Sequence, residues 1–113
     1  MTSEDVADQI SVTDLKNAMD SGEHLVLLDV REPHELKICA LNYTLHIPMG
    51  DLRFRLDELE PFKEKDIVVY CRSGRRSNMA AMFLAELGFK SVKNLSGGVL
   101  AWSDQIDPTI TKY

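Results

Sequence analysis

The sequence predicts an α/β fold in which a mainly parallel β-sheet carries helices on both faces. Two almost wholly apolar runs, residues 25–30 and 66–70, have the composition of strands that are buried on both faces. Stretches with helical spacing of their apolar residues separate the strand signals. Strands that are joined through helices make right-handed crossovers, so this alternation favours a parallel sheet.

Each element has a local signal. The first helix is expected after Ser11, because "SVTD" resembles a capping box with Asp in place of Glu, and Gly22 ends it. Later helices are marked by Pro33 at one start and by Gly88 at one end. The remaining elements are expected, in order, as strand 25–30, helix 33–39, strand 44–48, helix 49–59, strand 66–70, helix 77–89, strand 92–95 and helix 97–106.

Length and charge limit the possible functions. The 113 residues suit one domain over 1–113, with a short lead-in at 1–9 and a loose tail at about 107–113. Thirteen basic against 18 acidic residues give a net charge of −5, which argues against a nucleic-acid partner. No apolar run reaches the roughly 20 residues of a membrane span, and the acidic start lacks the order of a secretory signal. With two cysteines in different contexts, we expect a cytoplasmic protein with reduced thiols.

Positive charge gathers beside one thiol in the cysteine loop, residues 71–77, "CRSGRRS". This loop joins a strand to a helix, so successive backbone N–H groups can point at its centre and form an anion-binding nest. Gly74 suits the unusual backbone angles of such a turn, and Ser77 is a good N-cap for the helix. The candidate site residues of the loop are Cys71, Arg72, Ser73, Gly74, Arg75, Arg76 and Ser77.

A thiol in this setting should ionise at neutral pH. Helix N-termini and nearby cations lower a cysteine pKa from about 8.5 to roughly 3.5–7.5. No histidine lies near Cys71 in the sequence to act as a base, so the loop itself would be the activator. The alternative is a buried core cysteine before a solvated arginine cluster. The Gly-containing turn, the three arginines and the helix start together favour a functional nucleophile.

Three ordered stretches resemble the single-domain form of the rhodanese (thiosulfate sulfurtransferase) family. They are "LLDVREPHEL" (27–36), "IVVYCRSGRRS" (67–77) and "NLSGGVLAW" (94–102). The resemblance implies a five-stranded sheet, no cofactor, and a Cys71 that accepts a sulfane sulfur as a persulfide and passes it on. It also implies that Arg72 to Arg76 form the active-site loop and that Ser77 is the hydroxyl residue that follows. Asp29 and Arg31 match the family's Asp-x-Arg motif, which supports the loop and its entrance, and Glu35 matches the acid downstream of it.

The resemblance also suggests partners. The donor would be a small molecule such as thiosulfate or a persulfide-carrying protein, and the acceptor a thiol or cyanide. "DVREPHE" and "IPMGDL" look like relatives fused to adenylyltransferases that activate sulfur carriers, so such a system is a further candidate partner. At 39–44 the chain reads "CALNYT" where the family usually has Gly-His-Ile-Pro-Gly-Ala, a departure in local backbone shape.

Two other functions remain as alternatives. Cysteine-dependent phosphatases and arsenate reductases also use a cysteine in an anion cradle, but phosphatases need C-x5-R. Here the sixth position after Cys71 is Ser77, and Arg76 comes one residue early. A catalytically silent binding or regulatory module is the second alternative, although inactive relatives commonly lack the cysteine.

Several other reactive residues have a structural interpretation. The three histidines, His24, His34 and His46, show no metal-ligand spacing, so no metal site is expected. Cys39 reads as a small buried hydrophobe rather than a resolving thiol, and Trp102 as a core residue.

Overall fold

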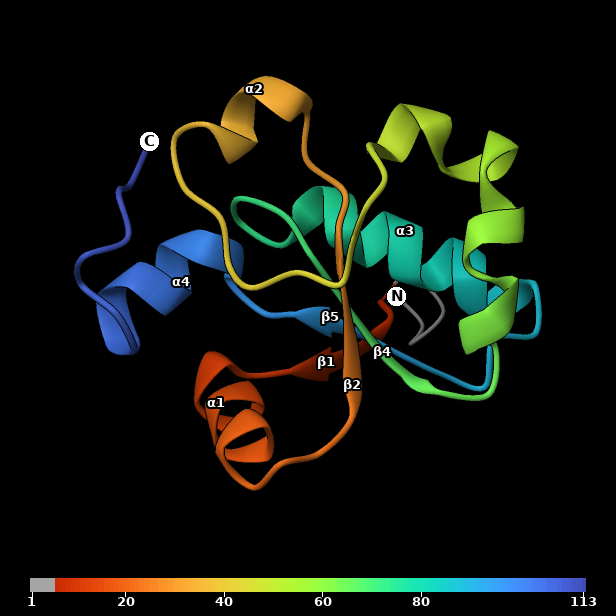
Figure 1. Cartoon of the computed structure of the whole chain (residues 1–113), viewed down its shortest axis with the longest axis horizontal. Helices are drawn as coiled ribbons and strands as arrows, with labels where there is room; N and C mark the ends of the chain where they lie inside the picture. The colour runs from red at the N-terminus through yellow and green to blue at the C-terminus, as the bar shows by residue number, and fades with distance from the viewer. Residues whose placement is uncertain (1–5) are drawn as a thin grey trace.

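A five-stranded, all-parallel sheet forms the centre of the molecule, as the computed structural model of residues 6–113 shows (Figure 1). Its order is β1-β5-β4-β2-β3. The strands are β1 (Asp8–Ile10), β2 (Leu25–Asp29), β3 (Leu45–His46), β4 (Asp66–Tyr70) and β5 (Ser91–Leu95). The predicted α/β class, with its five strands, is confirmed.

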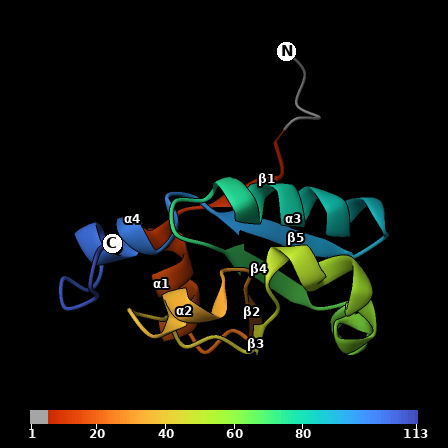
Figure 2. The ribbon, with the colours of Figure 1, turned by 90° about the horizontal axis from the view of Figure 1, so that it is seen from above.

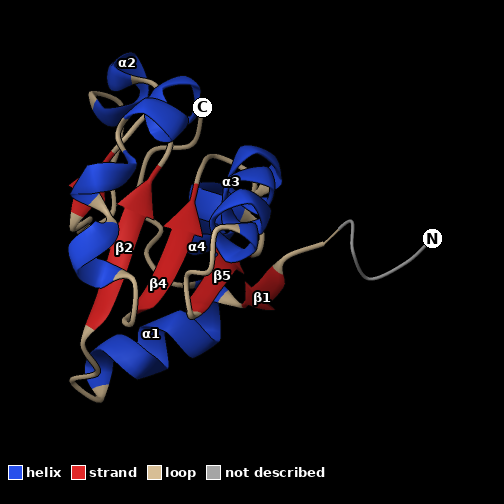
Figure 3. Ribbon diagram, turned by 90° about the vertical axis from the view of Figure 1, so that its right-hand side faces the viewer, coloured by secondary structure: helices blue, strands red, loops and turns tan. Residues whose placement is uncertain are grey.

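Helices cover both faces of this sheet (Figure 2, Figure 3). The helices are α1 (Val12–Asp20), α2 (Pro33–Leu36), α3 (Arg75–Glu86) and α4 (Gly98–Gln105), with short 3₁₀ helices η2 (Met49–Phe54), η3 (Leu56–Glu58) and η4 (Glu60–Phe62). One core lies between the sheet and α3 with the 3₁₀ helices, and the other lies between the sheet and α1 with α4. No helix in the described part of the chain is long and apolar enough to span a membrane.

Side chains of the two central strands alternate between the two cores, as the two-residue period of a strand requires. On β4, Ile67 and Val69 pack towards α3, whereas Val68 and Tyr70 pack towards α1 and α4. Cys71, the next residue, continues the alternation and lies on the α3 side. The alternation therefore places the Cys71 side chain on the face of the sheet that α3 covers.

The first helix begins as predicted, because the Ser11 side chain accepts a hydrogen bond from the Asp14 N–H at 3.0 Å. Two other predictions were wrong. Strand β1 occupies residues 8–10 and includes the last two residues of the lead-in expected at 1–9, whose first five residues lie outside the described part of the chain. Residues 49–59 form 3₁₀ turns instead of one α-helix, because the backbone leaves helical geometry at Arg55, with φ −126° and ψ 26°.

The tail at 107–113 has no helix or strand, but it is not loose as expected. The Ser103 hydroxyl donates to the Ile110 carbonyl at 2.7 Å. Ile110 and Tyr113 pack against the core beneath α1 and α4. The Tyr113 hydroxyl also accepts a hydrogen bond from Arg31, which precedes α2, and donates one to Glu35, which belongs to α2. Side-chain contacts thus bring the last residue back to the carboxyl end of the sheet.

Candidate active site

The cysteine loop leaves the carboxyl end of β4 and turns directly into α3. Gly74 has φ +98°, a left-handed backbone that favours glycine, and it is the N-cap of the helix. The predicted N-cap role of Ser77 was therefore wrong, because α3 starts two residues before it, at Arg75. Ser77 instead lies in the first turn and is fully buried. Its hydroxyl is thereby available inside the loop.

Hydrogen-bond donors surround the sulfur of Cys71. The Gly74 N–H lies 3.1 Å from Sγ, the Ser77 N–H 3.5 Å and the Ser77 hydroxyl 3.3 Å. Burial raises the pKa of the Cys71 thiol, but hydrogen bonds from Ser77, Gly74 and Ser73 together hold that pKa below its ordinary value. Cys71 is only 1% exposed, so these donors take the place of water around its side chain.

Backbone N–H groups at the start of α4 donate hydrogen bonds to two carbonyls of the cysteine loop. The Val99 N–H donates to the Cys71 carbonyl at 3.0 Å, and the Leu100 N–H donates to the Arg72 carbonyl at 3.1 Å. Gly98 permits this approach, because a Cβ on it would lie 2.4 Å from the Cys71 carbonyl oxygen. With two of its carbonyls bonded to α4, the loop is held in a shape that turns its N–H groups to the sulfur.

The three loop arginines have different surroundings. Arg76 donates two hydrogen bonds to Glu35, at 2.7 and 2.9 Å. This pairing lowers the pKa of Glu35 to about 2 and raises the pKa of Arg76. The Arg72 guanidinium lies over the ring of Tyr113, 5.2 Å from its centroid. Arg75 is exposed and makes no ion pair within the described chain, so its charge faces solvent.

Behind the arginines lies a fully buried ion pair. Arg31 donates to both carboxylate oxygens of Asp29 at 2.8–3.1 Å and to the Cys39 carbonyl at 2.8 Å. Its remaining nitrogen donates to the Tyr113 hydroxyl at 2.9 Å, which in turn donates to Glu35 at 2.9 Å. A continuous chain of hydrogen bonds therefore runs from the end of β2, through Tyr113 and Glu35, to Arg76.

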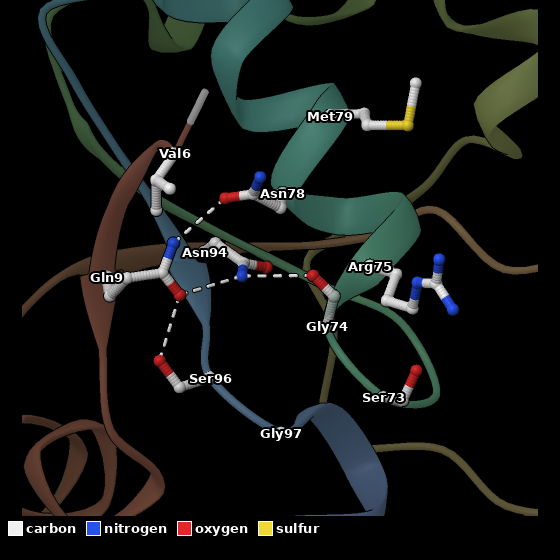
Figure 4. Close-up of a pocket in the computed structure, with 10 residues that line it drawn as sticks. All are labelled: Val6, Gln9, Ser73, Gly74, Arg75, Asn78, Met79, Asn94, Ser96 and Gly97. Atoms are coloured by element: carbon white, nitrogen blue, oxygen red, sulfur yellow. Dashed lines mark hydrogen bonds between the residues drawn. The ribbon is translucent and has the colours of Figure 1, made fainter. Parts of the chain in front are cut away.

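A groove of about 440 Å³ lies on the other side of the loop, between β1, β5 and α3 (Figure 4). Asn94 of β5 forms part of its lining and donates to the Gly74 carbonyl at 3.1 Å. Gln9 of β1 accepts a hydrogen bond from Asn94 at 2.9 Å. These polar contacts tie the loop to the edge of the sheet.

Comparison with known proteins agrees with this geometry. The sequence profile of the family described as "Rhodanese-like domain" matches residues 11–105. The chain belongs to the rhodanese-like family. Its cysteine loop and its Asp-x-Arg motif both lie at carboxyl ends of neighbouring parallel strands, β4 and β2.

Several relatives match the rhodanese-like chain over most of its length. A protein named "Sulfurtransferase" from Allochromatium vinosum is 34% identical over 98 residues, which cover 87% of this chain and 90% of that protein. "Adenylyltransferase and sulfurtransferase MOCS3" from Arabidopsis thaliana is 36% identical over an alignment of 119 residues, gaps included. The alignment covers 93% of this chain but only 26% of MOCS3. The crystal structure of a rhodanese-related protein from Thermoplasma volcanium superposes with a TM-score of 0.77 at 31% identity, covering 88% and 93% of the two chains.

Four residues of this rhodanese-like site were missed by sequence reasoning: Gln9, Asn94, Gly98 and Tyr113. Only Gly98 carried a local signal, because two adjacent glycines before a helix indicate a close backbone approach. By contrast, Cys39 and Trp102 lie in the core on the α1 side, as predicted. Among the predicted site residues, Glu35 binds Arg76 of the loop directly. The Asp29–Arg31 pair reaches Glu35 through the Tyr113 hydroxyl.

Proposed function

We propose that the chain is a sulfurtransferase that accepts a sulfane sulfur on Cys71 as a persulfide and passes it to a thiophilic acceptor. One observation carries the proposal. The Cys71 sulfur is buried at the centre of a loop whose donors, at 3.1–3.5 Å, stabilise a negative charge on it.

With thiosulfate as donor, the reaction balances in two steps. The Cys71 thiolate attacks the outer sulfur of thiosulfate, a new S–S bond forms, and sulfite leaves with the electron pair of the broken bond. The acceptor, cyanide or a thiolate, then attacks the terminal sulfur and restores the Cys71 thiolate. Neither step needs an oxidant, a reductant or a resident cofactor. Ser73, Gly74 and Ser77 supply hydrogen bonds, and Arg72, Arg75 and Arg76 supply positive charge for the dianion.

The chemistry of Cys71 defines the class of sulfur donor and the class of sulfur acceptor. The donor is a small sulfane-sulfur compound such as thiosulfate or a protein that carries a persulfide. The likeness to MOCS3, whose name joins an adenylyltransferase and a sulfurtransferase, supports a sulfur-carrier or adenylyltransferase system as partner. In this proposal Glu35 supports the loop entrance by its direct bonds to Arg76, and the buried Asp29–Arg31 pair supports it through Tyr113.

The test is a thiosulfate:cyanide assay with mass analysis of Cys71 after donor treatment. We expect thiocyanate formation and one added sulfur on Cys71, both abolished by Cys71→Ser. Cys39→Ser is the matched control, because Cys39 is a buried free thiol in the other core, and it should keep activity. Cleavage of an aryl phosphate instead would indicate the phosphatase alternative. Absence of both activities and of any persulfide would indicate a silent binding module.

A further inference from the structure

Asn94 is fixed in one orientation beside the cysteine loop. Asn94 belongs to β5 and is 3% exposed. The amide nitrogen donates to the Gly74 carbonyl at 3.1 Å and to the Gln9 side-chain oxygen at 2.9 Å (Figure 4). That Gln9 oxygen also accepts from the Ser96 hydroxyl at 2.9 Å. Because both partners of Asn94 are acceptors, its nitrogen must face them and its oxygen must face the opposite way.

The oxygen of Asn94 therefore points at Ser77. Asn94 Oδ1 lies 2.5 Å from Ser77 Oγ, and the same Oγ lies 3.3 Å from Cys71 Sγ. An amide oxygen has no hydrogen to donate, so this contact requires the hydroxyl hydrogen of Ser77. A serine hydroxyl has only one hydrogen. Two acceptors, one amide oxygen and one sulfur, are thus placed around a single donor.

We propose that Asn94 is a positioning residue for the sulfur chemistry, and that its amide oxygen competes with the Cys71 sulfur for the hydroxyl hydrogen of Ser77. The inference rests on the proposed function in one respect, that Cys71 is the nucleophile. While Cys71 is a thiol, the Ser77 hydrogen is directed at Asn94, and the Ser77 oxygen can accept the S–H. When Cys71 ionises, the single hydroxyl hydrogen is shared between the sulfur and the Asn94 oxygen. The hydrogen stays on Oγ throughout, so no covalent bond is made or broken.

This competition has a consequence for the reaction cycle. A thiolate that is fully stabilised by donors has a low pKa but is also a weaker nucleophile. By taking part of the Ser77 donor, Asn94 leaves the Cys71 thiolate more reactive than three full hydrogen bonds would. Once a persulfide forms, the negative charge moves to the outer sulfur, and the hydroxyl can return to Asn94.

The charges around Cys71 are independent of this pair of uncharged side chains. They come from the loop and the start of α3 (Arg72, Arg75 and Arg76), from α2 (Glu35), and from the end of β2 with the residues after it (Asp29 and Arg31). From the remaining neighbours, β5 offers the amide of Asn94, β1 the amide of Gln9, and α4 the N–H groups of Val99 and Leu100. Substitution of Asn94 or Ser77 by an uncharged residue therefore removes none of these charged side chains.

A double-mutant cycle tests the competition through the apparent pKa of Cys71, measured from the pH dependence of its alkylation by iodoacetamide. The four proteins are the Cys39→Ser variant, which leaves Cys71 as the one thiol, and that variant with Asn94→Leu, with Ser77→Ala, and with both. With Ser77 present, Asn94→Leu should raise the thiolate-to-thiol ratio at fixed pH by about three- to tenfold, because the whole donor becomes available to sulfur. With Ser77→Ala, the same change should not raise this ratio.

The cycle separates the competition from the tether that Asn94 also provides. Loss of the hydrogen bond to the Gly74 carbonyl affects both backgrounds alike, so only the difference between them reports on the hydroxyl. Equal shifts of the pKa in the two backgrounds would overturn the proposal. Asn94→Ala replaces Asn94→Leu if the larger side chain prevents folding. Because alkylation needs no sulfur donor, this outcome does not depend on whether the transfer assay succeeds.

Discussion

Replacement of Gly98 by alanine should show how much stability depends on the close contact between α4 and the cysteine loop, apart from the cost of a left-handed backbone. Gly98 has φ +57°, and a Cβ there would lie 2.4 Å from the Cys71 carbonyl oxygen and 2.5 Å from that of Arg72. Gly22 is a matched control. It has φ +77°, and a Cβ on it would have no neighbour within 4 Å.

The structure allows the two costs to be compared. A left-handed backbone costs an alanine roughly 1–2 kcal/mol at either position. Overpacking adds about 1–3 kcal/mol at Gly98 alone, because the two obstructing atoms belong to the backbone and cannot swing aside. We therefore expect the free energy of unfolding to fall by about 1–2 kcal/mol for Gly22→Ala and by about 2–5 kcal/mol for Gly98→Ala.

Urea denaturation gives the two stability losses, and iodoacetamide alkylation shows whether the loop has moved. Gly98→Ala should change the alkylation rate of Cys71, since the carbonyls of Cys71 and Arg72 must shift to admit the methyl group. Gly22→Ala should leave that rate as in the wild type, because Gly22 follows α1 at the amino end of β2. Equal stability losses and equal alkylation rates in the two variants would refute the close seating of α4 on the loop.

Two further changes test the charges around the loop. The pKa of Glu35 is lowered to about 2 by its Arg76 partner, so its stabilisation is complete above about pH 4.5 and is lost as the pH falls towards 2. Because Arg76 is 36% exposed, Glu35→Gln should lower the free energy of unfolding at pH 7 by only about 1–2 kcal/mol, and it should weaken the dependence of stability on acid pH. Glu58→Gln, in an exposed pair, is the control and should leave that pH dependence unchanged. An unchanged pH dependence in Glu35→Gln would contradict the pairing. Arg75→Ala should raise KM for thiosulfate more than it lowers kcat and weaken the salt dependence of kcat/KM, and salt-independent wild-type kinetics would contradict steering by Arg75.

Local sequence signals were sufficient for most of the fold. The apolar runs of β2 and β4 and the capping signals of α1 located those elements, because each signal depends on residues that are adjacent in the chain. Strand β1 has three residues, of which one is apolar, and it pairs with β5 alone at the edge of the sheet. Its position depends on that pairing, which no local pattern encodes.

The residues of the site likewise fall into those that adjacent sequence predicts and those that depend on distant contacts. Cys71 and its loop could be predicted because strand, turn and helix start follow directly in the sequence. The bonds of Asn94 to Gly74 and of Tyr113 to Glu35 join residues 20 and 78 positions apart, so they could not be predicted from spacing. The role of Ser77 was misassigned for a related reason. A left-handed Gly74 starts the helix early, and serine then lies inside the first turn.

The bonds from α4 to the loop also determine what solvent exchange at α4 would measure. The backbone N–H groups of Val99 and Leu100 belong to the first turn of a helix, where amide protons ordinarily exchange quickly because they have no partner within the helix. Here both are bonded to carbonyls of Cys71 and Arg72. Their exchange with deuterium should therefore follow the opening of the cysteine loop rather than fraying of α4. Two amides outside the loop thus act as natural reporters of how often the buried sulfur becomes uncovered.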